Sequence, residues 1–234
     1  MPLVALISDV HGNLPALEAV VKKIDTFKPD QWVCLGDVVG YGPFPSECID
    51  LIRSRNIPTV MGNHDAGVSG NLTIKHFRNP NRKLIQKTQE ILSKEQLRWL
   101  QNLPETLVDD NNWIAVHANP LEPLKWDYVD SAIKARNILA SINAQLCFVG
   151  HTHIPFVVSN KIGLLGFNKD QKYLINPGSV GQPRDEDFRA SFCLVDTEKW
   201  EIKMERVEYN TEKVLTGLTN LGFSRGESHI LLRY

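Results

Sequence analysis

The sequence lacks features that would place it in several classes of protein. Its 234 residues include only four cysteines, and no two of them form a CxxC pair. We therefore expect reduced, buried thiols, as in a cytoplasmic protein. No run of about 18 apolar residues is present, which is what a transmembrane helix needs, so no membrane partner is expected.

The chain also lacks an excess of charge of one sign. Lys and Arg number 26 and Asp and Glu number 27, for a net charge of -1. The chain therefore lacks the basic excess typical of proteins that bind long nucleic acids, and such a partner is not expected. No linker or low-complexity tract divides the chain, so we expect one domain over residues 1–234. The run Leu3–Ile7 is too short for the core of a signal peptide.

Five short apolar runs are present, and each is followed within two residues by a side chain that can bind a metal. The runs and the residues that follow them are Leu3–Ile7 with Asp9, Trp32–Leu35 with Asp37, Thr59–Met61 with Asn63, Trp113–Val116 with His117, and Leu146–Val149 with His151. Each run predicts a buried strand. Ligands bind outside the carboxyl ends of strands in open α/β sheets, so the pattern predicts one composite site.

Helical and strand patterns alternate in the first part of the chain and strands dominate its last third. Helices are predicted over residues 14–24, 46–53, 82–92, 129–142 and 211–221, and after Ser93, which forms a capping box with Gln96. Further strands are predicted at 57–61, 156–158, 173–175, 191–195 and 200–207, a hairpin turn at 110–112, and a polar loop from residue 66. The expected fold class is α/β, a four-layer αββα sandwich of two face-to-face mixed β-sheets with helices outside.

The polar residues after the strands form recurring motifs, with five of the seven histidines inside them. The motifs are DVHGN at 9–13, GD at 36–37, GNHD at 62–65, His117 and GHTH at 150–153. Together with GDVVGYGPFPSEC, EQLRWLQNLP, GHTHIP and NPGSVGQPR, they resemble the calcineurin-like metallophosphoesterases, in particular the small single-domain prokaryotic phosphodiesterases. The resemblance runs through most of the chain.

The resemblance implies a metallophosphoesterase fold with two metal sites that share one carboxylate. Asp9, His11, Asp37 and His153 would bind one ion, and Asp37, Asn63, His117 and His151 the other. His64 would be catalytic, contacting the phosphate and leaving group as general acid or electrostatic clamp. Two ions about 3.5–4 Å apart can share a water, lower its pKa and so supply a bridging hydroxide that attacks phosphorus.

The donor types narrow the metal and the substrate. Imidazole and oxygen donors without thiolate suit Mn, Fe, Zn, Ni or Co better than Ca or Mg, and we name manganese first. The expected function is hydrolysis of a small phosphodiester or phosphomonoester. A dinucleoside polyphosphate hydrolase and a non-catalytic protein-interaction scaffold on the same fold are the alternatives. Whether copies of the chain form a homo-oligomer stays open.

Some positions depart from the pattern of the family, and others lie outside the proposed ligand set. Protein phosphatases of the family have GDxxDR, whereas here the stretch Gly36–Tyr41 lacks that Asp and Arg, so protein phosphatase activity is not expected. Ala118 stands where the group has Gly. Arg184 is interpreted as an exposed loop residue, with a phosphate clamp as the alternative. Gly12, Gly36, Gly62 and Gly150 are expected to let the backbone turn sharply at the strand ends.

Overall fold

Nine strands and eight α-helices lie in the part of the chain that this computed structural model describes, residues 3–110, 113–163 and 166–232. The strands are β1 (Leu3–Ile7), β2 (Gln31–Cys34), β3 (Thr106–Asp109), β4 (Trp113–Val116), β5 (Leu146–Phe148), β6 (Phe156–Ser159), β7 (Tyr173–Asn176), β8 (Ala190–Asp196) and β9 (Glu201–Val207). The helices are α1 (Leu14–Asp25), α2 (Pro45–Ser54), α3 (Asn63–Ser69), α4 (Asn81–Ile91), α5 (Lys94–Gln101), α6 (Ala132–Ser141), α7 (Thr211–Asn220) and α8 (Arg225–Leu232).

The strands form two sheets that pack face to face. One sheet has the order β2-β1-β8-β9 and the other β3-β4-β5-β7-β6. Successive side chains of a strand point to opposite faces, and in β1 Val4 and Leu6 belong to the core between the sheets whereas Ala5 and Ile7 pack on the other side. Phe148 and Trp113 contribute to the inter-sheet core from the second sheet.

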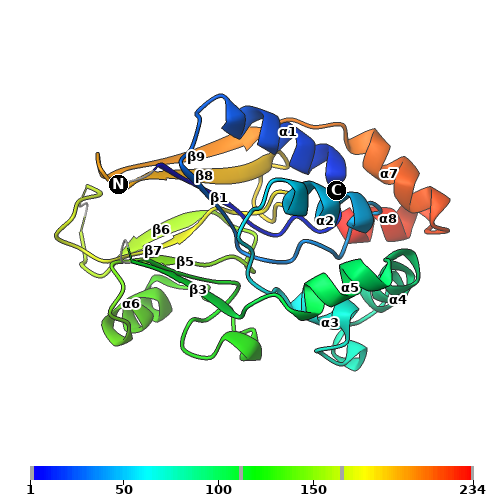
Figure 1. Cartoon of the computed structure of the whole chain (residues 1–234), viewed down its shortest axis with the longest axis horizontal. Helices are drawn as coiled ribbons and strands as arrows, with labels where there is room; N and C mark the ends of the chain where they lie inside the picture. The colour runs from blue at the N-terminus through cyan, green and yellow to red at the C-terminus, as the bar shows by residue number, and fades with distance from the viewer. Residues whose placement is uncertain (1–2, 111–112, 164–165, 233–234) are drawn as a thin grey trace.

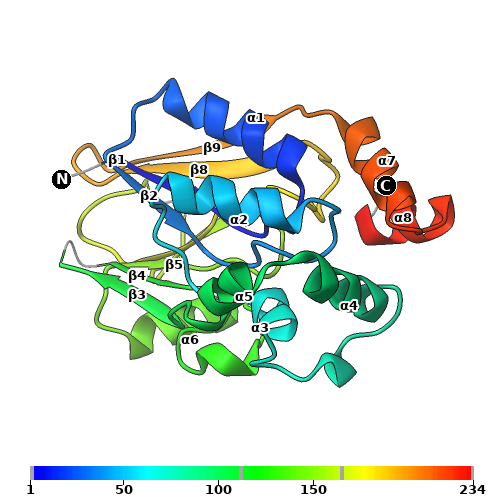
Figure 2. The same ribbon diagram turned by 45° about the vertical axis from the view of Figure 1, so that its right-hand side comes forward.

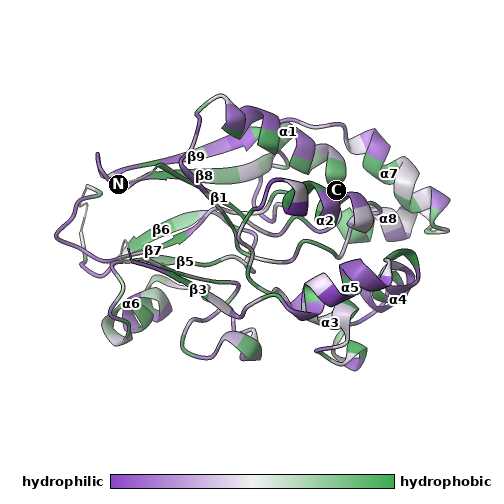
Figure 3. Cartoon of the chain, in the orientation of Figure 1, coloured by the Kyte–Doolittle hydropathy of each residue, from purple (hydrophilic) through white to green (hydrophobic). Residues whose placement is uncertain are grey.

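Helices cover the outer faces of both sheets (Figure 1, Figure 2). The first sheet packs on α1 and α2, and the second on α6, where Ile138 and Leu139 meet Cys147 and Leu174. In Figure 3, α1 is banded green and purple, as expected for a helix with one buried face. The predicted four-layer sandwich is confirmed. Among the described residues, none of the helices has the length and hydrophobicity needed to cross a bilayer.

Side chains cap the first turns of three of the predicted helices, α1, α5 and α6. The Asn13 side chain accepts a hydrogen bond from the Ala16 N–H, 3.2 Å away, at the start of α1. Ser93 and Gln96 form the predicted capping box of α5. The helix predicted from residue 129 begins at Ala132 instead, because the Ser131 side chain caps it. Each cap satisfies an N–H that has no partner within its helix.

The segment Ile57–Met61, predicted as a strand, is not a strand in the structure. It pairs with β2 through one parallel bridge between Thr59 and Cys34. Pro58 has no N–H to donate to a ladder, and the N–H of Met61 donates to the carbonyl of Pro104, 2.8 Å away. The segment therefore leaves the sheet edge after one pair and leads into α3.

Two helices, α3 and α8, were not predicted. Residues of α3 fall within the predicted polar loop, because its seven residues contain Gly67 and no apolar repeat, and the helix is capped by Asp65, which accepts from the Gly62 N–H. The start of α8 could have been predicted from the sequence. Ser224 and Glu227 have capping-box spacing, and each side chain accepts from the other's N–H.

The sheet topology brings the predicted motifs to one end of the sandwich. β1 and β2 are parallel, as are β4, β5 and β7, whereas β8 is antiparallel to β1. The first sheet is thus mixed, as the fold class predicted. β3 and β4 form the predicted antiparallel hairpin, and residues 111 and 112 of its turn lie outside the described part. The helices α3, α4, α7 and α8 gather at the same end (Figure 1).

Candidate metal centre

The predicted ligands converge at the carboxyl ends of four strands from both sheets. Six of the seven are buried, and Asn63, the first residue of α3, is half-buried. The buried residues are Asp9, His11, Asp37, His117, His151 and His153. The composite site predicted from five separate segments is therefore assembled in space.

Four donor atoms surround one point at the end of β1. His11 Nε2 lies 3.1 Å from His153 Nε2 and 3.5 Å from Asp37 Oδ2. Asp9 Oδ1 lies 3.2 Å from His153 Nε2. Donors that share an ion at about 2.0–2.2 Å lie roughly 3.0–3.5 Å from one another, so the spacing suits a transition-metal ion.

A second group of four donors adjoins the first. His117 Nε2 lies 3.1 Å from His151 Nδ1, 3.2 Å from Asn63 Oδ1 and 3.4 Å from Asp37 Oδ2. The same oxygen of Asp37 therefore belongs to both groups. A carboxylate in this position can bridge two ions.

In each carboxylate, one oxygen is held by donors and the other faces the histidines. Asp9 Oδ2 accepts from the Ser8 hydroxyl and the His151 N–H, at 2.7 and 3.1 Å. Asp37 Oδ1 accepts from the His64 N–H at 2.8 Å. Asp9 Oδ1 is buried without a hydrogen-bond partner among the described residues. These hydrogen bonds fix the carboxylates so that the remaining oxygens face the histidines, an arrangement that could hold a metal ion.

The imidazole rings are oriented by backbone carbonyls. The Nδ1 atoms of His11, His117 and His153 lie 3.2, 2.7 and 2.6 Å from the carbonyl oxygens of Val39, Leu35 and Gln182, which they reach by donating an N–H. When His11 and His153 are neutral, this tautomer leaves a lone pair on each Nε2, so their 3.1 Å contact brings two lone pairs together. A cation between them would relieve this repulsion, so the donor set fits a metal.

The electrostatics of the pocket favour positive charge. Burial lowers the pKa of His117, but Asp37, Asp9 and the Leu35 carbonyl together raise it to about 9. Burial raises the pKa of Asp9, but the neighbouring His153 and His117 together hold it below its usual value. Both carboxylates are thus ionised, in a buried place where charge must be compensated.

His64 lies next to both donor groups, within the first turn of α3. Its ring centroid is 4.6 Å from that of Tyr41, 4.8 Å from that of His11 and 5.0 Å from that of Phe77. Burial lowers the pKa of His64 to about 4, with Asp37 opposing the shift, so the ring is neutral near pH 7. Its Nδ1 has no partner among the described residues. A donor atom of His64 also lies within 4.8 Å of donors from His11 and Asp37, so its position alone is compatible with a ligand role.

The backbone at the site adopts an unfavourable conformation that the sequence did not indicate. Asp9, His11, Asp37, His151 and His153 all have φ between 50° and 66°. The left-handed region costs an L-residue roughly 1–2 kcal/mol, and such conformations concentrate at functional sites. No local sequence signal marks an Asp or His for this region.

The expected role of the glycines is correct for Gly36, with a φ of 87°, but not for two others. Gly62 and Gly150 do not have positive φ, and they are required because other groups approach closely. A Cβ on Gly62 would lie 2.1 Å from Asp37 Oδ1, and one on Gly150 would lie 2.0 Å from Ser8 Oγ.

Gly62→Ala is expected to disturb the metal centre. The new methyl must displace Asp37, and a ligand misplaced by about 1 Å costs roughly 10²-fold in rate. Metal content and hydrolysis rate measure the effect. Gly226→Ala is the matched control, because its Cβ meets open space in α8 and alanine favours a helix by about 1 kcal/mol. Equal behaviour of the two variants would contradict the assignment.

Arg184 was interpreted as an exposed loop arginine, and this is wrong. It is half-buried beside Tyr41, with its guanidinium carbon 5.8 Å from the ring centroid. Tyr41 is itself buried, 4.5 Å from the His11 ring. Tyr128, which the sequence analysis did not single out, stacks on His151 at 4.2 Å. The positions of these residues depend on contacts between segments that are distant in sequence. The spacing of apolar residues along the chain does not reveal such contacts.

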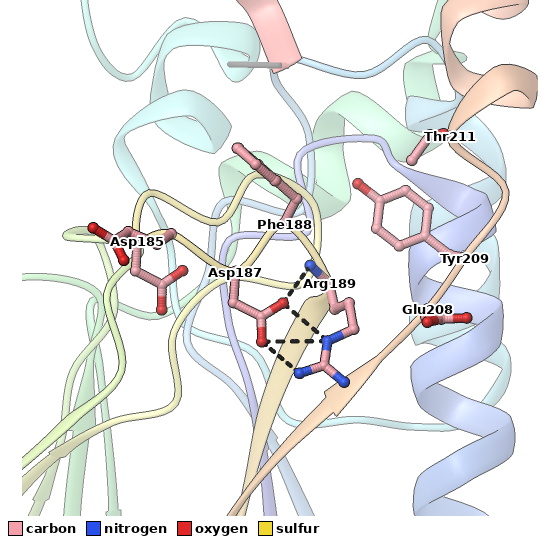
Figure 4. Close-up of a pocket in the computed structure, with 8 residues that line it drawn as sticks. Asp185, Asp187, Phe188, Arg189, Glu208, Tyr209 and Thr211 are labelled. Atoms are coloured by element: carbon pink, nitrogen blue, oxygen red, sulfur yellow. Dashed lines mark hydrogen bonds and ion pairs between the residues drawn. The ribbon is translucent and has the colours of Figure 1, made fainter.

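A hollow of about 890 Å³ lies apart from the histidines. It is lined by the loop after Arg184 and by residues that follow β9, and Figure 4 shows Asp187 paired with Arg189 within it. None of the predicted ligands lines it. The hollow is therefore separate from the candidate metal centre.

Comparisons with known proteins identify the family of the chain. The model of the calcineurin-like phosphoesterase superfamily domain matches residues 3–200. An uncharacterized protein of Methanocaldococcus jannaschii is 41% identical over 225 residues, covering 90% of this chain and 89% of that protein. The crystal structure of a metallophosphoesterase from Sphaerobacter thermophilus is 35% identical with a TM-score of 0.83, covering 98% of this chain and 97% of that one. A symmetrical bis(5'-nucleosyl)-tetraphosphatase of Salmonella paratyphi C is 28% identical over 151 residues, covering 59% of this chain and 50% of that enzyme.

Proposed function

The chain belongs to the calcineurin-like phosphoesterase superfamily and is a phosphoric ester hydrolase, and from this premise we propose that it uses two divalent ions to hydrolyse a small phosphodiester or phosphomonoester. The observation that carries the proposal is the position of Asp37 Oδ2, which lies 3.5 Å from His11 Nε2 and 3.4 Å from His117 Nε2. One oxygen is thus shared between two complete groups of donors.

The proposed ligands divide between the two ions as the donor groups do. Asp9, His11, Asp37 and His153 would hold one, and Asp37, Asn63, His117 and His151 the other. When bound, the pair would supply Lewis-acid polarisation of the phosphoryl group and a water of lowered pKa. All four cysteines are buried and free and none is a donor here, so we propose manganese first and iron, zinc, nickel or cobalt as alternatives.

His64 would act on the substrate from beside the ions. The ring is neutral in the free protein, so it can donate one N–H to a phosphoryl oxygen or to the leaving-group oxygen. Such a group typically contributes about 10²–10⁴ in rate. Phe77 and Tyr41, whose ring centroids lie 5.0 and 4.6 Å from that of His64, would hold the ring in place and limit the access of water.

A dinucleoside polyphosphate hydrolase is the second candidate. It is favoured by the similarity to the symmetrical tetraphosphatase, although the chain spans half of that enzyme's length. A non-catalytic scaffold is less favoured, because a scaffold needs neither the buried, oriented donors nor an unpartnered His64.

Hydrolysis assays across metals test the proposal. We expect the purified protein to hydrolyse bis(p-nitrophenyl) phosphate when Mn²⁺, Ni²⁺ or Co²⁺ is added and to lose the activity in EDTA, because the proposed ions provide most of the charge stabilisation. A panel of nucleotides and dinucleoside polyphosphates separates the two enzyme candidates. No turnover with any metal, together with a stable protein partner in a pull-down, would favour the scaffold.

A further inference from the structure

Arg184 has an unusual environment for a half-buried arginine. Its Nε and Nη2 donate to Gln182 Oε1 at 3.1 and 2.9 Å, and Nη2 donates to the Tyr41 hydroxyl at 3.1 Å. Both acceptors are neutral. Within the described ranges it forms no ion pair with a carboxylate, so its charge is oriented but not compensated.

Neighbouring arginines differ in this respect. Arg189 pairs with Asp187, with Nη2 to Oδ2 at 2.6 Å (Figure 4), and Arg206 pairs with Asp185. The same loop therefore offers carboxylates, and they are used by other residues. A charged group that is partly withdrawn from water without a counter-ion is costly unless a ligand supplies the opposite charge.

The support of Arg184 is shared with the metal centre. Gln182 accepts from the Nδ1 of the proposed ligand His153 through its backbone carbonyl, and its side-chain amide donates to the Leu231 carbonyl in α8. The Arg184 N–H donates to the His153 carbonyl at 3.3 Å. The helix that the sequence did not predict therefore helps to hold the guanidinium at the site.

Tyr41 fixes the distance between the arginine and the reacting groups. Its ring contacts the imidazoles of His11 and His64, with centroids 4.5 and 4.6 Å apart, and its hydroxyl contacts Arg184. Arg184 therefore contacts the reacting groups only through Tyr41, and we expect it to meet an anionic group next to the phosphoryl group that meets His64.

We propose that Arg184 and Tyr41 form a subsite for a second phosphate group adjacent to the one that is hydrolysed. This inference rests on the proposed function and narrows its substrate class to esters with two or more linked phosphates, such as nucleoside polyphosphates. Two divalent ions, the two carboxylates and a bound hydroxide would together leave one positive charge, which a singly charged diester compensates, so the charge of Arg184 remains for a further phosphate group. Arginine presents its N–H groups in a fork that matches phosphate oxygens.

Substrate discrimination tests the subsite. With Mn²⁺ present, kcat/KM is measured for diadenosine tetraphosphate and for bis(p-nitrophenyl) phosphate, which has no second phosphate. Arg184→Gln is expected to lower the ratio of the two values by about tenfold or more, as for a lost hydrogen bond to a charged group. Arg184→Lys keeps the positive charge but lacks the forked pair of N–H groups, so its ratio should lie between those of wild type and Arg184→Gln. Arg189→Gln is the matched control, because that arginine is exposed and already paired, and its ratio should equal that of wild type.

Calorimetry with inorganic tripolyphosphate measures binding to the subsite without requiring turnover. The Kd of the Mn²⁺-loaded protein is expected to rise about tenfold in Arg184→Gln and to stay unchanged in Arg189→Gln. If wild type hydrolyses neither ester while this difference persists, the subsite stands and the proposed function fails. If the two kcat/KM values fall in parallel and the Kd stays at its wild-type value, Arg184 only supports the fold of the site and the subsite is refuted.

Discussion

Asp37→Asn is expected to remove both metal ions and to lower metal-dependent hydrolysis by about 10³-fold or more, the scale of the charge stabilisation that a metal pair provides. Oδ2 of Asp37 faces both His11 and His117, so one substitution weakens both sites. Asparagine keeps the size of the side chain and tolerates the φ of 53° at this position. The backbone should therefore be retained while the shared charge is lost.

Elemental analysis and the rate of ester hydrolysis measure this variant together. Asp170→Asn is the matched control, because the same chemical change is made at an exposed position, and it should keep the metal content and rate of wild type. Retention of both ions by Asp37→Asn, with a rate within about tenfold of wild type, would contradict the shared-ligand assignment.

His64→Ala is expected to keep both ions and to lose about 10²–10⁴ in turnover, the usual contribution of a positioned acid or hydrogen-bond donor. The proposed ligand groups are complete without His64, and its Nδ1 has no other partner among the described residues. Turnover is measured at saturating metal and substrate. His64→Gln, which restores an N–H donor near the same place, should recover part of the rate.

The metal content of His64→Ala decides between two roles that the geometry allows. His64 lies close enough to donors of His11 and Asp37 to complete a ligand set, in which case the variant would lose an ion. Loss of an ion, or an unchanged turnover, would refute the assigned role. His229→Ala, at a partly exposed position in α8, controls for the loss of an imidazole elsewhere.

Much of the layered fold could be predicted because it depends on local patterns. The runs that became β1, β4 and β5 are short and apolar, and burial on both faces requires that composition. Ser93 and Gln96 predicted the start of α5, because residues three positions apart can form the reciprocal hydrogen bonds of a capping box. The strand predicted at Ile57–Met61 does not form. Pro58 has no N–H to donate to a neighbouring strand, and the N–H of Met61 donates to the carbonyl of Pro104 instead.

The identities of the converging residues could be predicted, but their environment could not. Asp, Asn and His at strand ends are visible in the sequence, and the topology of parallel strands collects them at one edge. The carbonyls that orient His11 and His153 belong to Val39 and Gln182, remote in sequence. Arg184 was assigned to an exposed loop for the same reason, since only the folded chain brings it to Tyr41.

The most direct measurement of the central claim is the metal content of the wild-type protein after saturation with Mn²⁺ and removal of free ions by gel filtration. If Asp37 joins two sites, elemental analysis should find about two ions per chain, the number that a bridged pair requires. Recovery of protein with no ion retained would contradict the claim that these buried oxygens and imidazoles form a metal centre.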